Sequence, residues 1–146
     1  MTRARDLADS ADKDIAGTLT LDGLDVAGNV SVDGGTIKLD GNYPVGTGNV
    51  ALGNTALDSV EAGGTYNVAL GDAAGTAITT GDNNVAVGAD ALLLNSSCGS
   101  NTALGTSSVR SNTTGSNNVG LGQAALYSNT TASNNTAIGY QAGYSN

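Results

Sequence analysis

The segment Asn49-Val50-Ala51-Leu52-Gly53 decides the fold, because close copies of it recur through the rest of the chain. The later copies begin at an asparagine, with a first step of 18 residues and then steps of 17, at Asn67, Asn84, Asn101, Asn118 and Asn135. Self-similarity at a fixed period indicates a repeat protein in which each copy mainly contacts its neighbours.

The repeat favours β-structure over helices. The common helical repeats need about 33 residues, and the segments are rich in Gly, Asn and Thr, which are poor helix formers. In a strand, Val and Leu of this segment would point one way and Asn, Ala and Gly the other. A pair such as Ala56-Leu57 could form a second, shorter strand, and linkers such as 111–117 consist of turn residues. We therefore expect one coil of a parallel β-solenoid per repeat, with two short strands and two turns.

Stacked coils would place equivalent residues in columns about 4.8 Å apart, so six coils over residues 46–146 would give a rod of about 29 Å. The asparagines would form a ladder with amides bonded between coils, at Asn49, Asn67, Asn84, Asn101, Asn118 and Asn135. An apolar column would contain Leu52, Leu70, Val87, Leu104, Leu121 and Ile138. The column of Ala and Gly between them, from Ala51 to Ala137, is too small to fill a wide core and suits the close approach of another backbone.

A narrow solenoid of this kind buries little apolar area, and its ends expose strand edges. Self-association would relieve both problems. We expect sister copies to pack in parallel through one apolar column per chain.

The first 45 residues differ from the repeats. Residues 17–45 contain short alternating strands closed by glycine turns, such as Thr18-Leu19-Thr20-Leu21 before Asp22-Gly23. They predict either a two-layer array of hairpins or a shaft of interlocked short strands from three chains. Residues 1–16 are highly charged and predict a disordered tail or one short helix, which could dock on a partner. The docking candidates are Arg3, Arg5, Asp6 and Leu7.

Composition argues against enzymes and nucleic-acid binders. The sequence has no His, the commonest acid–base catalyst and metal ligand, and its single cysteine excludes an internal disulfide and multi-cysteine zinc sites. The net charge is -8 and only five basic residues are scattered through the chain, which does not suit phosphate binding. No apolar stretch approaches the roughly 18 residues needed for membrane insertion. We predict that the protein is not an enzyme and has no cofactor, metal or catalytic residue.

Several short motifs have a simpler explanation in the repeat. The pattern G-x-G-x-x-A, typical of dinucleotide sites, occurs at 46–51 and 120–125 but lacks a βαβ context. Glycosylation sequons begin at Asn95, Asn112 and Asn129, and we interpret them as turn residues. Cys98 stands where most repeats have Gly, which indicates a turn variant.

The coils Asn-x-Ala-[Leu/Val/Ile]-Gly-x-x-Ala resemble the head repeats of trimeric autotransporter adhesins. This resemblance implies left-handed parallel β-rolls in a homotrimer. Residues 125–131 and 137–143, the opening MTRARDLAD and residues 32–44 are more similar to bacteriophage tail-fibre proteins, particularly those of cyanophages. The N-terminal pattern favours the phage proteins, because an adhesin needs a signal peptide and a C-terminal membrane anchor, and we find neither pattern.

The resemblance implies a structural tail-fibre component in the virion, made in the host cytoplasm. Its N-terminus would bind a phage tail, neck or baseplate protein, and the trimeric solenoid would project outward for host attachment. A host receptor could be bound by a distal part outside this sequence, if the sequence is the N-terminal part of a longer fibre. The alternative is a fragment of a bacterial surface adhesin. A polysaccharide-degrading fibre enzyme would need paired carboxylates, and residues 91–146 have none.

Overall fold

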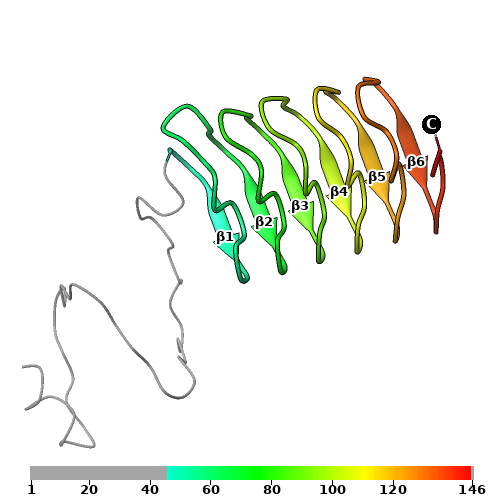
Figure 1. The fold of residues 1–146 in the computed structure, drawn as a ribbon, viewed down its shortest axis with the longest axis horizontal. Coiled ribbons are helices and arrows are strands. Elements are labelled where there is room, and N and C mark those ends of the chain that lie inside the picture. The colour runs from blue at the N-terminus through cyan, green and yellow to red at the C-terminus, as the bar shows by residue number, and fades with distance from the viewer. Residues whose placement is uncertain (1–45, 146) are drawn as a thin grey trace, which may run out of the picture. The chain divides into compact units, whose positions relative to one another are not determined.

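The computed structural model describes residues 46–145, which form a parallel β-solenoid with one strand per repeat (Figure 1). The predicted shaft at 17–45 and tail at 1–16 lie outside the described residues. Each strand has three residues; they are β1 (Val50–Leu52), β2 (Val68–Leu70), β3 (Val85–Val87), β4 (Thr102–Leu104), β5 (Val119–Leu121) and β6 (Thr136–Ile138). The prediction of a parallel solenoid with turns of about 17 residues is confirmed.

The strands pair in chain order in one six-stranded parallel sheet, β1-β2-β3-β4-β5-β6. The register is that of the repeat: Ala86 lies opposite Ala103, and Ala103 lies opposite Gly120. We number the coils by their ladder asparagines, so that coils 1 to 5 span 49–66, 67–83, 84–100, 101–117 and 118–134, and coil 6 begins at Asn135. Five turns of the chain thus separate β1 from β6 (Figure 1).

The prediction of a second strand in each coil is wrong, because the described residues contain only one strand per coil. The residues six and eight positions after each ladder Asn have positive φ; Ser107 has 57° and Val109 has 49°. This left-handed conformation breaks the alternation of a strand. Two consecutive side chains, such as Ser108 and Val109, can therefore both be buried inside the coil.

These turn segments nevertheless bond from coil to coil and form a second wall opposite the sheet. The Val109 N–H donates to the Ala125 carbonyl at 2.8 Å, and the Ser111 N–H donates to the Tyr127 carbonyl at 3.1 Å. We call this side the turn wall. Alternate N–H groups of this wall are therefore bonded from coil to coil, although its conformation is that of a turn.

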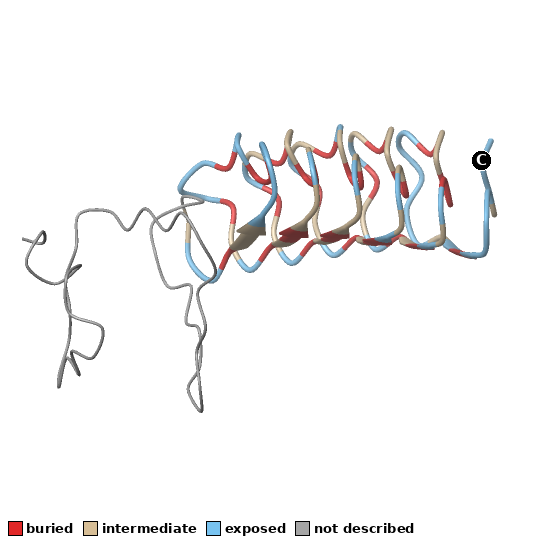
Figure 2. Ribbon diagram, turned by 90° about the horizontal axis from the view of Figure 1, so that it is seen from below, coloured by how far each residue is buried: buried red, intermediate tan, exposed pale blue. Residues whose placement is uncertain are grey.

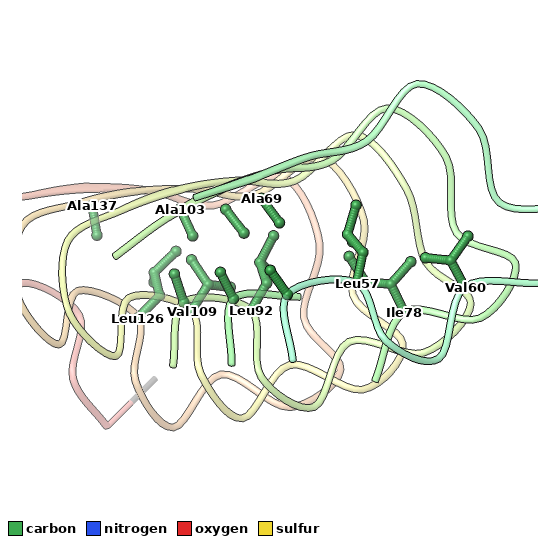
Figure 3. Close-up of a cluster of buried hydrophobic side chains, with 13 residues drawn as sticks. Leu57, Val60, Ala69, Ile78, Leu92, Ala103, Val109, Leu126 and Ala137 are labelled. Atoms are coloured by element: carbon green, nitrogen blue, oxygen red, sulfur yellow. The ribbon is translucent and has the colours of Figure 1, made fainter. Parts of the chain in front are cut away.

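The core lies between the strand wall and the turn wall. The strands contribute the Ala column, and the turn wall contributes larger residues that point toward it, including Leu57, Leu92, Val109 and Leu126 (Figure 3). Ala69 and Leu92 are both fully buried, and buried positions recur from coil to coil (Figure 2). Small residues on one wall thus make room for branched residues on the other, which keeps the coil narrow.

The exception in the Ala column, Gly120, follows from this packing. A Cβ atom at Gly120 would lie 2.6 Å from both the Ser108 hydroxyl oxygen and a Val109 methyl group. The Ser108 hydroxyl also donates to the Gly120 carbonyl at 2.9 Å. Glycine is therefore required where the preceding coil presents Ser and Val, and the G-x-G-x-x-A pattern at 120–125 has a structural cause.

Candidate interaction face

The predicted Asn ladder runs through the interior of the solenoid and joins each coil to the next. The Oδ1 atom of Asn101 accepts the N–H of Asn118 at 2.9 Å. Its Nδ2 atom donates to the Gly115 carbonyl at 3.0 Å, three residues before Asn118. Asn67, Asn84, Asn101 and Asn118 are fully buried. These side chains hold backbone turns in place and are not accessible to a ligand.

A second set of buried asparagines, Asn95, Asn112 and Asn129, lies eleven positions after the ladder residues of coils 3 to 5. The Asn112 amide donates to the Gly115 carbonyl at 2.7 Å and to Asn95 Oδ1 at 3.1 Å, and it accepts the Gly115 N–H at 3.1 Å. The sequence showed this column as an Asn recurring every 17 residues, but its role as a buried ladder was not predicted. The side chains of Asn95, Asn112 and Asn129 are buried, and each amide nitrogen donates to the carbonyl three residues ahead of it, which agrees with their interpretation as turn residues.

Cys98 lies beside this second set of asparagines and contacts Asn95 and Asn112. Its thiol donates to Asn95 Oδ1 and approaches the Thr113 carbonyl at 3.4 Å. Burial raises the pKa of the thiol, and hydrogen bonds, including one from the Asn112 side chain, partly oppose this rise. The protonated thiol is therefore the favoured form, and Cys98 is placed as a structural turn residue and not as a nucleophile.

The side of the sheet that faces away from the core is apolar, and we call it the outer face. It comprises the first and third residue of each strand: Val50, Leu52, Val68, Leu70, Val85, Val87, Thr102, Leu104, Val119, Leu121, Thr136 and Ile138. All of these residues are exposed or half-buried. The column predicted from Leu52 to Ile138 is in register across the sheet, and it lies on the outer face, whereas the Ala column lies inside.

The outer face has no charged residue. The acidic residues of the described chain lie in coils 1 to 3, at Asp58, Glu61, Asp72, Asp82 and Asp90, and its one basic residue is Arg110. Arg110 lies on the turn wall, where its Nε is 3.7 Å from an Asp90 carboxylate oxygen and its guanidinium lies 5.7 Å from the Tyr127 ring centre. The outer face can therefore make apolar contacts without desolvating a charge.

Other kinds of site have little support in the described residues. Between residues 46 and 145 no three His, Cys, Asp or Glu side chains gather as metal ligands. The same residues contain no helix that could cross a bilayer. The docking candidates Arg3, Arg5, Asp6 and Leu7 lie outside the described residues.

We compared the chain with protein-family models, with curated proteins and with solved structures, and none of the three comparisons gave a match.

Proposed function

We propose that this protein is a structural component of a bacteriophage tail fibre, in which sister chains pack through their outer faces into a rigid homotrimeric rod. The observation on which the proposal rests is the outer face: an uncharged, apolar stripe in register over six strands. A stripe of this length on a soluble rod is typical of a surface that is covered in the working assembly. The number of three chains and the virion setting come from the resemblance of the repeats to adhesin heads and phage fibres.

The solenoid suits a spacer. Each coil contacts only its neighbours, so a rod can be lengthened by adding coils without changing their packing. In this proposal residues 1–16 bind a tail, neck or baseplate protein, and the rod projects toward the host. A bacterial surface adhesin would use the same rod and is the alternative.

The oligomeric state of two matched variants tests the interface. Leu104 on the outer face and Leu94 on the turn wall are exposed to almost the same degree, 44% and 43%. Leu104→Asp should dissociate a trimer to monomers in light scattering coupled to size-exclusion chromatography, because it places three charges in an apolar interface. Leu94→Asp should leave the trimer intact. A monomeric wild-type chain would contradict the proposal.

The virion setting needs a separate experiment. Electron microscopy of purified virions with an antibody against residues 1–16 should label the tail, neck or baseplate. Labelling of the surface of uninfected bacteria would instead support the adhesin alternative.

A further inference from the structure

The outer face has two parallel columns of side chains that differ in size and exposure. The first column holds the first residue of each strand, Val50, Val68, Val85, Thr102, Val119 and Thr136. The third column holds the third residue of each strand, Leu52, Leu70, Val87, Leu104, Leu121 and Ile138. In β1, β4 and β5 the third residue is exposed and the first is half-buried. In five of the six coils, therefore, a longer side chain stands beside a shorter, β-branched one.

The spacing of these columns restricts what can cover them. Because all six strands pair in register, the apolar side chains recur about every 4.8 Å along the rod. The turns of an α-helix laid along the rod recur about every 5.4 Å, so after five steps they would be about 3 Å out of register. A strand laid along the rod presents side chains on one face only about every 6.7 Å. A second copy of this chain has the same spacing over the whole face, and it is the occupant that fits.

Symmetry then decides which columns of two copies meet. Copies arranged around an axis parallel to the rod are related by rotation alone, so equivalent coils lie at the same height. Each outer face has its first column on one side of its midline and its third column on the other. Around the axis the two kinds of column therefore alternate, and every contact between chains joins a third column to a first column.

We propose that the third column of each chain packs, coil by coil and at the same height, against the first column of the next chain. This inference rests on the proposed function and names the contact inside its trimer. Leu104 of one chain lies against Thr102 of the next, so long side chains alternate with short ones around the axis and fill it evenly. An antiparallel pair of outer faces would instead bring like columns together, with the long side chains opposed and a gap between the short ones.

Disulfide crosslinking of the full chain tests this contact. The background is Cys98→Ala, because alanine stands at the equivalent position 132 of coil 5. After oxidation, the double variant Thr102→Cys/Leu104→Cys should give covalent trimers on a denaturing gel, at least about tenfold more than either single variant. Each single variant should stay uncrosslinked, because a residue of the other column separates its cysteines. Leu94→Cys/Thr102→Cys is the matched control and should give no covalent trimer, since Leu94 lies on the turn wall at 43% exposure, against 44% for Leu104.

Two further measurements keep the inference testable if cysteines in coil 4 weaken the assembly. The equivalent double variant in coil 5, Val119→Cys/Leu121→Cys, should give the same covalent trimer. Co-expression of a Val87→Cys chain with a Leu104→Cys chain should give no covalent dimer. That dimer would overturn the inference, because the third residues of coils 3 and 4 meet only in an antiparallel pair.

The crosslinks also separate failure of this inference from failure of the proposed function. A monomeric wild-type chain contradicts the proposed trimer itself. A trimeric wild-type chain whose double variants in coils 4 and 5 both stay uncrosslinked contradicts only the pairing of third with first columns. Covalent dimers from Leu104→Cys alone would likewise overturn that pairing, because they would place like columns in contact.

Discussion

Coils 1 and 2 differ from coils 3 to 5 in how they fill one interior column, eleven positions after each ladder asparagine. In coils 1 and 2 the column holds Val60 and Ile78, and in coils 3 to 5 it holds Asn95, Asn112 and Asn129, all buried. The carbonyl three positions further on is Gly81 in coil 2, which accepts one side-chain amide, that of Asn67. The equivalent Gly115 carbonyl in coil 4 accepts two, from Asn101 and Asn112.

The same backbone path therefore accommodates either an apolar side chain or an amide side chain at this interior position. In coils 1 and 2 a buried apolar side chain stabilises the turn through packing, and in coils 3 to 5 a second amide stabilises it through hydrogen bonds. A buried amide is tolerated only where its polar atoms are paired. In coils 3 to 5 the amide nitrogen donates to a carbonyl three residues ahead of it, and Asn129 Oδ1 in coil 5 is the one buried amide oxygen of this column without a hydrogen-bond partner among residues 46–145.

The largest expected effect comes from removing a ladder amide in each region. Asn67→Ala leaves both the Gly81 carbonyl and the Asn84 N–H without a partner, whereas Asn101→Ala leaves the Gly115 carbonyl bonded to Asn112 and frees only the Asn118 N–H. An unpaired buried group costs about 1–3 kcal/mol, so we expect losses in unfolding free energy of about 4 kcal/mol for Asn67→Ala and about 2 kcal/mol for Asn101→Ala. Urea unfolding followed by circular dichroism measures both, with exposed Thr114→Ala as the control. Equal losses would show that the hydrogen bond from Asn112 to the Gly115 carbonyl does not compensate for the loss of the Asn101 amide.

Replacement of Ile78 in coil 2 by asparagine, the residue at this position in coils 3 to 5, tests whether the two interior side chains are interchangeable. Ile78→Ala should cost about 3 kcal/mol, because it leaves a cavity beside Leu57 and Gly75. Ile78→Asn should cost less, about 2 kcal/mol, because its amide can donate to the Gly81 carbonyl as Asn112 donates to Gly115. Ile78→Val, at about 1 kcal/mol, calibrates the packing loss. If Ile78→Asn were the worst of the three in thermal unfolding, the turns of the two regions would not be equivalent.

The strands and their parallel stacking were predictable because Asn-x-Ala-x-Gly combines an alternating pattern with a fixed period. The turn wall was not predictable from its Leu and Val residues, because these residue types rarely adopt positive φ. The position eight residues after the ladder Asn did contain an indication, because it holds Gly75 in coil 2 and Gly143 in coil 6, with φ of 60° and 61°. Glycines that alternate with apolar residues at a fixed repeat position indicate a left-handed conformation, which packing imposes on the apolar residues.

The sequence was enough to predict that the residues of the outer face align in a column, but not that this column faces away from the core. Alternation placed Val and Leu opposite Ala correctly, but it cannot say which side faces the core. The usual expectation that larger apolar residues are inside fails because the coil is narrow, and the turn wall already fills it with Leu57, Leu92 and Leu126. The second Asn column was visible in the sequence, yet polar turn residues are usually solvated, so burial could not be inferred from it.

A smaller effect is expected one position before each ladder asparagine, where coil 1 has a glycine and every later coil has a non-glycine residue with positive φ. Coil 1 is preceded by Gly48 at φ 71°, whereas coil 4 is preceded by Ser100 at φ 59°. Ser100 is exposed and has little side-chain packing to lose. Ser100→Gly should therefore stabilise the chain by about 0.5–1 kcal/mol, since a left-handed non-glycine residue costs about 1–2 kcal/mol and the added chain entropy offsets part of the gain. Ser97→Gly, at an exposed position without positive φ, should destabilise by a similar amount in the same urea titration.

The smallest effect is confined to high pH and to the amide-filled region. Burial raises the pKa of the Cys98 thiol, so above its ordinary value of about 8.5 the folded chain binds more protons than the unfolded chain. Stability therefore falls with pH, because unfolding then releases a proton. The contribution of Cys98 is fully present below pH 8 and is lost as pH rises through the folded pKa. Melting temperatures from pH 7 to 10 should diverge downward from those of Cys98→Ala, which lacks the thiol. Parallel curves would mean that the thiolate is as well accommodated beside Asn112 as in water.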